Sequence, residues 1–194
     1  MPYSKEHTEK SRARIIESAR VLFNTHGFEK VTINMVMSRA GMTHGGFYKH
    51  FKSKEALYAE AVKSFLGGRG ARWREEAGID PSALVPEMAQ HMLDSYLSQE
   101  HFEDLEGQCP MIALPSDVAR GNEDVQNAYQ DLLKSMVWLF QNTQSQEGPE
   151  ARQRALAMAC LCVGGMVLAR SIPDEALAKD VRSAAHAIAT DLSQ

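Results

Sequence analysis

The sequence lacks the features of a membrane or secreted protein. No apolar run reaches the roughly 20 residues that a bilayer span needs, and the first 14 residues are rich in charge, without the apolar run of a signal peptide. Cysteine is scarce: Cys109, Cys160 and Cys162 are an odd count without paired CxxC spacing, which argues against a disulfide framework and a structural zinc site. We therefore expect a soluble cytoplasmic protein with reduced thiols and without a metal or other cofactor.

Strand-like alternation is also absent, and clusters of β-branched residues are few. Apolar residues recur instead at helical spacing, as in residues 15–23, where Ile15, Ala19 and Leu22 share one face. The 194 residues, 44% of them hydrophobic, suffice for one medium domain or for a small domain plus a larger one. These patterns predict an all-α fold of about nine helices.

Caps and helix breakers set the expected helix bounds. Pro115 either kinks the helix that begins at Pro110 or opens a second one, and the glycines at 67, 68 and 70 predict a bend or fraying. Helices are expected over residues 8–26, after caps at Thr32, Thr43 and Ser53, over residues 82–99, from Pro110, over residues 123–144 and 150–171, and after Pro173.

Charge divides the chain unevenly. Residues 1–54 carry ten lysines and arginines against four carboxylates, whereas residues 55–194 carry eleven against twenty-one. A basic head on an acidic body indicates that only the head meets a polyanion, although a solvated basic face would give the same counts. We expect the boundary between residues 1–54 and 55–194 to lie in a continuous helix, since no linker composition is visible.

Two short helical segments lie in the basic part, separated by a glycine-containing turn of about four residues. This arrangement is typical of a helix-turn-helix motif, whose second helix enters the major groove of DNA. The second segment holds Gly45 and Gly46 side by side, although each glycine inside a helix costs about 1 kcal/mol relative to alanine. Either the glycines let the backbone approach DNA, or they let this helix pack closely on the first one.

The stretch from Thr32 to Leu57, TINMVMSRAGMTHGGFYKHFKSKEAL, closely resembles the DNA-binding segment of the tetracycline-repressor (TetR) family of transcriptional regulators. The resemblance covers roughly residues 10–60 and departs at Met37, where the family usually has alanine. It implies an N-terminal three-helix helix-turn-helix domain, joined by the fourth helix to a helical ligand-binding and dimerisation domain. The matching residues are Thr32, Ile33, Val36, Ala40, Gly41, Thr43, Gly45, Phe47, Tyr48, His50, Phe51, Ser53, Lys54 and Leu57.

The resemblance also implies function and partners. It points to a dimeric repressor, not an enzyme, that binds double-stranded operator DNA and is released by a small-molecule effector. Thr43 is expected to cap the second helix of the motif and touch a phosphate, while Phe47 and Phe51 belong to the core. The expected DNA contacts are Thr32, Arg39, Thr43, His44, Gly45, Gly46, Tyr48, Lys49, His50 and Lys54. Lys10, Arg12 and Arg14 are further candidates for contacts to the DNA backbone, but a solvated basic face explains them equally well.

The body offers less specific signals. Residues 155–170 are apolar on most sides, which favours a helix that pairs with a second copy, although a central core helix is the alternative. Methionine and aromatic residues in the body suit an adaptable ligand pocket, although most such stripes are core. The pocket candidates are Met88, Met92, Tyr96, Phe102, Met111, Tyr129, Met136 and Phe140, and the dimer-interface candidates are Cys160, Gly164, Gly165 and Leu168.

Cys109 suggests an alternative mode of regulation. It precedes Pro110 at the expected start of a helix, where the helix N-terminus lowers a thiol pKa, so it is a candidate sensor of oxidants or electrophiles. A plain small residue at a turn is the interpretation we favour. A thiol enzyme is disfavoured because no histidine and acid partner for Cys109 is evident in the sequence. A non-specific nucleoid protein would need a basic body, and this body is acidic. His91 and His101 suit ordinary hydrogen bonds better than metal ligation.

Overall fold

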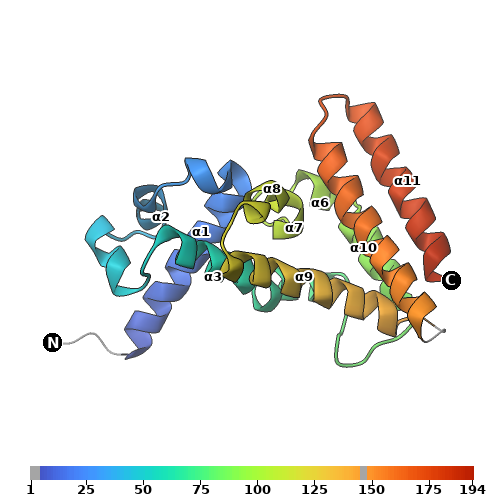
Figure 1. The fold of residues 1–194 in the computed structure, drawn as a ribbon, viewed down its shortest axis with the longest axis horizontal. Coiled ribbons are helices and arrows are strands. Elements are labelled where there is room, and N and C mark those ends of the chain that lie inside the picture. The colour runs from blue at the N-terminus through green and yellow to red at the C-terminus, as the bar shows by residue number, and fades with distance from the viewer. Residues whose placement is uncertain (1–4, 145–147) are drawn as a thin grey trace.

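The structure is a computed structural model that describes residues 5–144 and 148–194, and these form helices and connecting turns only (Figure 1). The predicted all-α class is confirmed. Eleven α-helices and one 3-10 helix occur in the described ranges, against the nine or so expected, because glycines and prolines divide several segments that the sequence pattern joins.

The N-terminal head contains α1 (Lys5–Lys30), α2 (Ile33–Arg39) and the 3-10 helix η1 (His44–Lys49), at the left of Figure 1, and α3 (Lys54–Gly67) leads from the head into the body. The hydroxyl of Thr32 accepts a hydrogen bond from the Met35 N–H at 3.2 Å, and that of Ser53 accepts one from Ala56 at 3.1 Å. Both caps are as predicted. Thr43 occupies the N-cap position of η1 but its hydroxyl makes no capping bond, so that prediction is wrong.

A glycine interrupts α1 near its end. Gly27 has φ 77° and ψ 167°, a conformation essentially reserved for glycine, and a Cβ there would lie 3.0 Å from a carboxylate oxygen of Asp117. The same oxygen accepts a hydrogen bond of 2.8 Å from the Phe28 N–H. The predicted stop at Gly27 is therefore a change of direction, after which the chain continues to Lys30.

The body contains α4 (Arg69–Glu76), α5 (Glu87–Tyr96), α6 (Gln99–Glu103), α7 (Pro110–Ala113), α8 (Pro115–Ala119), α9 (Glu123–Asn142), α10 (Pro149–Arg170) and α11 (Glu175–Ser193). The predicted bend near Gly68 is the break between α3 and α4. Pro115 opens a second short helix, which decides between the two alternatives for that residue. Helix α5 begins at Glu87, five residues later than expected, because Pro86 occupies its N-cap position.

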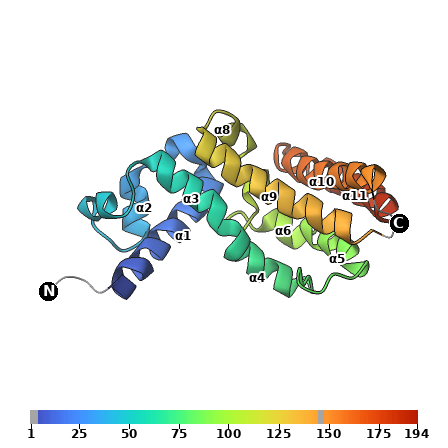
Figure 2. The same ribbon diagram turned by 60° about the horizontal axis from the view of Figure 1, so that its bottom comes forward.

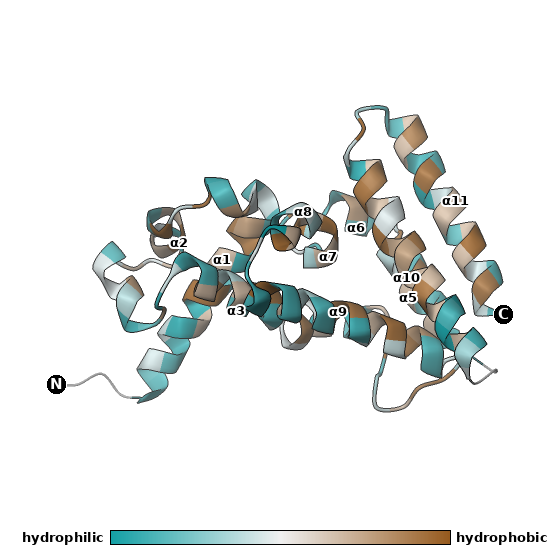
Figure 3. Cartoon of the chain, in the orientation of Figure 1, coloured by the Kyte–Doolittle hydropathy of each residue, from teal (hydrophilic) through white to brown (hydrophobic). Residues whose placement is uncertain are grey.

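Three long helices, α9, α10 and α11, make up most of the body. Helix α3 packs against α1 and also against α9, while α10 packs against α9 and α11, and Figure 2 shows α10 and α11 side by side beyond α9. By length and composition alone α10 could cross a membrane, which corrects the expectation that no such run exists. Figure 3 shows apolar residues along α10 and along its neighbour α11. Part of α10 packs against α9 and α11, and Leu156 and Leu168 on it are exposed.

Candidate nucleic-acid interface and internal cavity

The end of the head that is farthest from the body presents polar side chains over a buried aromatic base. Phe47 and Phe51 are buried, as predicted, whereas Tyr48 is 64% exposed. Gly46, His50 and Lys54 are half-buried. The other expected contacts are all exposed: Thr32, Arg39, Thr43, His44, Gly45 and Lys49.

The two glycines of η1 differ in their surroundings. A Cβ added at Gly45 would meet no atom of the described chain within 4 Å. At Gly46 it would make an ordinary contact of 3.5 Å with the Met37 side chain. Close packing inside the chain therefore does not require glycine at position 45, and the packing alternative fails there.

Several basic side chains of the head already have partners. Arg12 pairs with Glu60 at 3.3 Å and lies over the Phe51 ring, 4.8 Å from its centroid, while Arg14 donates to the carbonyl of Ala40. Lys49 forms no ion pair with any described residue. Burial, together with the charges of Arg12 and Lys49, lowers the pKa of His50 below its usual value, so the ring is largely neutral at pH 7.

Lys54 is used within the head. Its ammonium donates to the carbonyls of Phe28 at 3.0 Å and Val31 at 3.2 Å, and it lies 4.0 Å from the centroid of the Phe28 ring. The residue thus ties the start of α3 to the end of α1. An ammonium has three donors, so these two bonds leave a third for another acceptor.

The loop of residues 104–109 connects the head to the body. Asn24 of α1 donates to the carbonyl of Gln108 at 2.8 Å, and Gln108 donates back to the carbonyl of Asn24 at 3.3 Å. Arg20 donates to the carbonyl of Glu106 at 2.8 Å, and the Glu106 carboxylate pairs with Arg39 at 3.2 Å. All four bonds therefore depend on the position of one loop.

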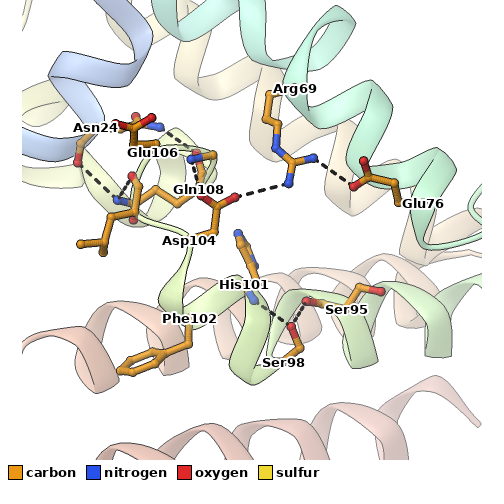
Figure 4. Close-up of polar contacts among 12 residues, drawn as sticks. Asn24, Arg69, Glu76, Ser95, Ser98, His101, Phe102, Asp104, Glu106 and Gln108 are labelled. Carbon is orange, nitrogen blue, oxygen red and sulfur yellow. Dashed lines mark hydrogen bonds and ion pairs between the residues drawn. The ribbon is translucent and has the colours of Figure 1, made fainter.

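The same loop is held from the body side, as Figure 4 shows. Arg69 pairs with Asp104 at 3.3 Å and with Glu76 at 3.1 Å, and the Asp104 carboxylate accepts the Gly107 N–H at 2.7 Å. The His101 backbone N–H donates to the Ser98 hydroxyl at 3.0 Å, which starts α6 just before the loop. The loop is therefore held by contacts to both the head and the body.

A small cavity of about 40 Å³ lies behind this loop, among α3, α4, α5 and α9. Four of the eight predicted pocket residues line it: Met92, Tyr96, Met111 and Met136. The remaining lining residues are not among those predicted for the pocket; they are Phe65, Leu66, Trp73, Arg74, His101, Gly107, Cys109, Leu132, Ser135 and Leu139.

The other four pocket candidates lie elsewhere. Met88 and Phe140 are buried in the core, and Tyr129 donates its hydroxyl to the Met111 carbonyl at 3.1 Å. Phe102 packs beneath the guanidinium of Arg182, 4.3 Å from the ring centroid. Helical periodicity identifies an inward face but does not separate cavity-lining from packed residues, and these four are packed.

The polar groups of the cavity are mostly neutral. Burial lowers the pKa of His101 to about 4, and its Nδ1 lies 2.7 Å from the Tyr96 carbonyl. Burial also raises the pKa of Tyr96, with smaller effects from Cys109 and Cys162. Arg74 donates to the carbonyl of Leu66 at 2.7 Å. At neutral pH Arg74 therefore carries the one formal charge among the lining residues.

The Cys109 thiol contradicts the expectation of a lowered pKa. Helix α7 has four residues, too few for a strong dipole, and Cys109 is only 3% exposed. Burial raises the pKa of Cys109 to about 11, so the thiolate needed by an oxidant sensor or a thiol enzyme is scarce near pH 7. Within the described residues, no group of three or more histidine, cysteine or acidic side chains could hold a metal ion.

Three of the four dimer-interface candidates lie at the surface of the chain. Cys160 and Leu168 are exposed on α10, and a Cβ at Gly164 would meet open space. Gly165 is different, since a Cβ there would lie 2.8 Å from the Ala185 Cβ, so it serves packing between α10 and α11 of one chain. Further apolar side chains are exposed on the same two helices: Leu156, Leu177 and Ile188.

Residues 15–61, which span most of the head, match the family model described as bacterial regulatory proteins, tetR family. An uncharacterised HTH-type transcriptional regulator of Bacillus subtilis is 35% identical over 63 residues, 32% of this chain and 31% of that protein. The HTH-type transcriptional regulator AcrR of Shigella flexneri is 27% identical over 100 residues, 50% of this chain and 46% of that protein. The chain thus spans half or less of the length of these curated relatives.

Similarity of the fold extends over nearly the whole chain. The crystal structure of E. coli NemR in its reduced form superposes with a TM-score of 0.73, covering 94% of this chain and 96% of that one. The sequence identity is only 17%, so this likeness concerns the fold alone.

The raised pKa of Cys109 predicts slow alkylation. At pH 8 a thiol of pKa about 11 is about 0.1% thiolate, roughly a hundredfold less than an unperturbed cysteine. Iodoacetamide should therefore leave Cys109 and Cys162 largely unmodified in the folded protein and modify all three cysteines in 8 M urea, as peptide mass spectrometry would report. Modification of Cys109 in the folded protein as fast as in urea would contradict the burial argument.

Proposed function

Because the chain belongs to the tetR family of bacterial regulatory proteins, we propose that it is a homodimeric transcriptional repressor that binds operator DNA and is released by a small ligand. The head, residues 1–54, would bind DNA, and the body, residues 55–194, would hold the ligand and the second copy. The observation that carries the proposal is the exposed polar surface around η1, built on a buried aromatic base, with Gly45 left open.

The proposed DNA contacts fall into two groups. Exposed side chains on η1, namely His44, Tyr48 and Lys49, would reach base edges and phosphates, and Thr43 has an uncapped hydroxyl for a phosphate. Thr32, Arg39, His50 and Lys54 would contact the DNA backbone and fix the register without reading sequence. Gly45 and Gly46 would let the backbone of η1 approach the duplex.

Dimerisation is proposed from the exposed face of α10 and α11. On α10 the residues Leu156, Cys160, Gly164 and Leu168 recur every fourth position, which places them along one side of the helix. Leu168 is 60% and Ile188 of α11 is 53% exposed, a costly arrangement unless another surface covers them. One short recognition helix also makes too few contacts for specific binding, so two copies are needed.

Release by a ligand is proposed from two elements shared by the cavity and the head. Helix α3 starts at the DNA-facing Lys54 and ends with Phe65 and Leu66 in the cavity wall. The loop of residues 104–109 lines the cavity with Gly107 and Cys109 and bonds to α1 through Glu106 and Gln108. Since the cavity is only about 40 Å³, far below the several hundred cubic ångströms of typical ligand sites, a ligand must displace these elements.

The alternatives have less support. Sensing or catalysis through Cys109 would require a reactive thiolate, and that thiol is buried with a raised pKa. Unspecific binding along DNA would require a basic body, and residues 55–194 are acidic. The cytoplasm is the proposed location, because operator DNA is the proposed partner.

Gly45→Leu should abolish operator binding. The added side chain meets no atom of its own chain, so the fold tolerates it, while it blocks the approach of the backbone to DNA. Fluorescence anisotropy with operator DNA selected from a random pool measures affinity, and circular dichroism measures folding. Gly67→Leu is the matched control, since its Cβ also meets open space but lies outside the head. Wild-type affinity in Gly45→Leu would remove η1 from the interface.

A charge on the exposed α10 and α11 face should separate the dimer. Leu168→Glu combined with Ile188→Glu places two carboxylates from each copy in the proposed interface, where burying unpaired charges of one sign is unfavourable. Sedimentation equilibrium should then give the monomer mass, 21.5 kDa, with a folded spectrum and lost operator binding. Val85→Glu, at an exposed apolar residue outside both helices, controls for added charge. A dimer that persists in the double variant would place the interface elsewhere.

Removal of the Asn24 amide should weaken the coupling between ligand and DNA. Asn24→Ala loses its bond to the Gln108 carbonyl, so displacement of the loop no longer reaches α1 through this contact. The test uses a compound selected because it releases the wild-type protein from operator DNA. The ratio of the operator affinity without compound to that with compound should fall by about threefold to tenfold, the factor that corresponds to the free energy of one hydrogen bond. Operator affinity without compound should change less.

The reciprocal measurement completes this test. Operator DNA must weaken binding of the same compound by the same factor, because coupling free energies are symmetric. Asn142→Ala, which removes a bond to the Trp138 carbonyl within α9, is the control and should leave the ratio unchanged. An equal loss in both variants, or an unchanged ratio in Asn24→Ala, would exclude coupling through this contact.

A further inference from the structure

We propose that the cavity takes an organic anion, an apolar body with a terminal carboxylate that binds Arg74 and the Tyr96 hydroxyl. The inference rests on the proposed function, since it names the ligand class for the site that would release DNA. It draws on four features of the cavity: its walls, its single charge, an unsatisfied hydroxyl and its size.

The walls select an apolar body. Phe65, Trp73 and Leu139 supply large apolar surfaces, and Met92, Met111 and Met136 add three flexible thioether side chains. Methionine adapts its shape to a ligand, and an aromatic ring against Trp73 would gain from stacking or edge contacts. Nothing in this part of the lining would hold a strongly hydrated compound.

Arg74 supplies the charge. Its guanidinium is half-buried at the cavity and donates to the Leu66 carbonyl at 2.7 Å. No ion pair joins it to a carboxylate of the described residues, although nearby Arg69 has two such partners, Glu76 and Asp104. A guanidinium withdrawn from water without an anion is unfavourable, and its fork of donors matches a carboxylate in bidentate geometry.

Tyr96 supplies an unsatisfied donor at the same cavity. The residue is 2% exposed, and among the described residues its hydroxyl makes no hydrogen bond of good geometry; the Cys109 thiol lies beside it, and a thiol is a weak hydrogen-bond partner. A buried hydroxyl without a partner costs about 1–3 kcal/mol, and a carboxylate oxygen from the ligand would remove that cost. The backbone carbonyl of Tyr96 is already hydrogen-bonded to the His101 ring, so the side-chain hydroxyl is the group of Tyr96 that is open to a ligand.

The other polar lining groups do not oppose an anion. His101 is neutral at pH 7 because its pKa is lowered to about 4, and Cys109 is neutral because its pKa is raised to about 11. Ser135 carries no charge and can donate a hydrogen bond. No aspartate or glutamate lines this cavity, so an entering carboxylate meets one cation and no fixed anion.

A neighbouring groove favours the opposite charge and is the main competitor. It measures about 360 Å³, shares Trp73 and His101 with the cavity, and has Arg69 against four acidic residues. Glu76 and Asp104 are already paired with Arg69, and the Asp94 carboxylate accepts from Gln90 at 2.6 Å and lies 2.7 Å from Nε2 of His186, which leaves Glu100. A cation would have to bind there, outside the apolar walls, so compounds of equal shape and opposite charge distinguish the two sites.

The size of the cavity limits the ligand. A volume of about 40 Å³ holds a few water molecules, so even one aromatic ring requires the methionines and the loop of residues 104–109 to move. Small compounds with one ring and a short chain are therefore the first probes. The chosen acids are 3-phenylpropionate and 5-phenylpentanoate, each with its neutral amide and its amine counterpart.

Tryptophan fluorescence reports binding directly. The chain has two tryptophans; Trp138 is 46% exposed on α9, and Trp138→Phe leaves Trp73 in the cavity wall as the one reporter. Titrations without DNA should show at least one acid binding about tenfold or more tightly than its amide, and its amine more weakly still. Tighter binding of an amine, equal binding of acid and amide, or no response to either acid would overturn the proposal.

Variants at the two anchoring residues locate the carboxylate. Arg74→Met should weaken binding of the acid by about 10- to 100-fold, the range for a charge-assisted hydrogen bond, while leaving the amide nearly unaffected. Arg74→Lys should retain part of the affinity. Arg72→Met is the matched control, because Arg72 lies on the same helix, is exposed and does not line the cavity. Equal losses in the Arg72 and Arg74 variants would overturn the assignment of Arg74.

Tyr96→Phe provides a variant that is expected to fold. Its hydroxyl has only the weak thiol of Cys109 beside it among the described residues, so the free energy of unfolding without ligand should change little, while affinity for the acid should drop about threefold to tenfold. If Arg74→Met unfolds, this variant still decides the question, and unchanged affinity in it would contradict the proposed pose.

Adding operator DNA separates this inference from the proposed function. Acid binding that leaves operator affinity unchanged would contradict release by this ligand class and leave the site intact. Release by an uncharged or cationic compound, with no acid bound, would support the proposed function and overturn this inference.

Discussion

The reciprocal hydrogen bonds between Asn24 and Gln108 are the contact through which the cavity loop holds the buried face of α1. Asn24 lies on the buried face of α1, and Gln108 lies in the loop that also lines the cavity. Both side chains are amides, so each donates to the backbone carbonyl of the other residue and neither is charged. The bonds are therefore insensitive to pH near neutrality and to salt, and the position of the head follows the position of the loop.

Residues with strong local preferences made most of the fold predictable. Thr32 and Ser53 cap their helices as expected, Pro115 opens a helix, and the break between α3 and α4 falls at the predicted glycines. Thr43 misled because its side chain makes no capping bond in a 3-10 turn. Helix α10 is apolar on most sides, as the sequence indicates; it packs against α9 and α11 and also leaves Leu156 and Leu168 exposed.

The cavity was only half predictable because it depends on contacts between distant segments. Met92, Tyr96, Met111 and Met136 are apolar residues on inward faces, which a periodic pattern can identify. Arg74 and Gly107 have no apolar signal, and they reach the cavity only because Gly68 turns α4 and Asp104 holds the loop. The thiol of Cys109 shows the same limit, since its burial, and not its place before a helix, sets its pKa.

The contacts that orient the head are unusually distant in sequence. Phe28 and Asp117 are separated by 89 residues, Arg20 and Glu106 by 86, and Asn24 and Gln108 by 84. Closing such long loops carries an entropic cost that local helix formation does not, and non-local contacts slow folding. During synthesis the residues of the head leave the ribosome well before Gln108 and Asp117 exist. The head helices can form early, but their orientation relative to the body is fixed only after the first 117 residues have been made.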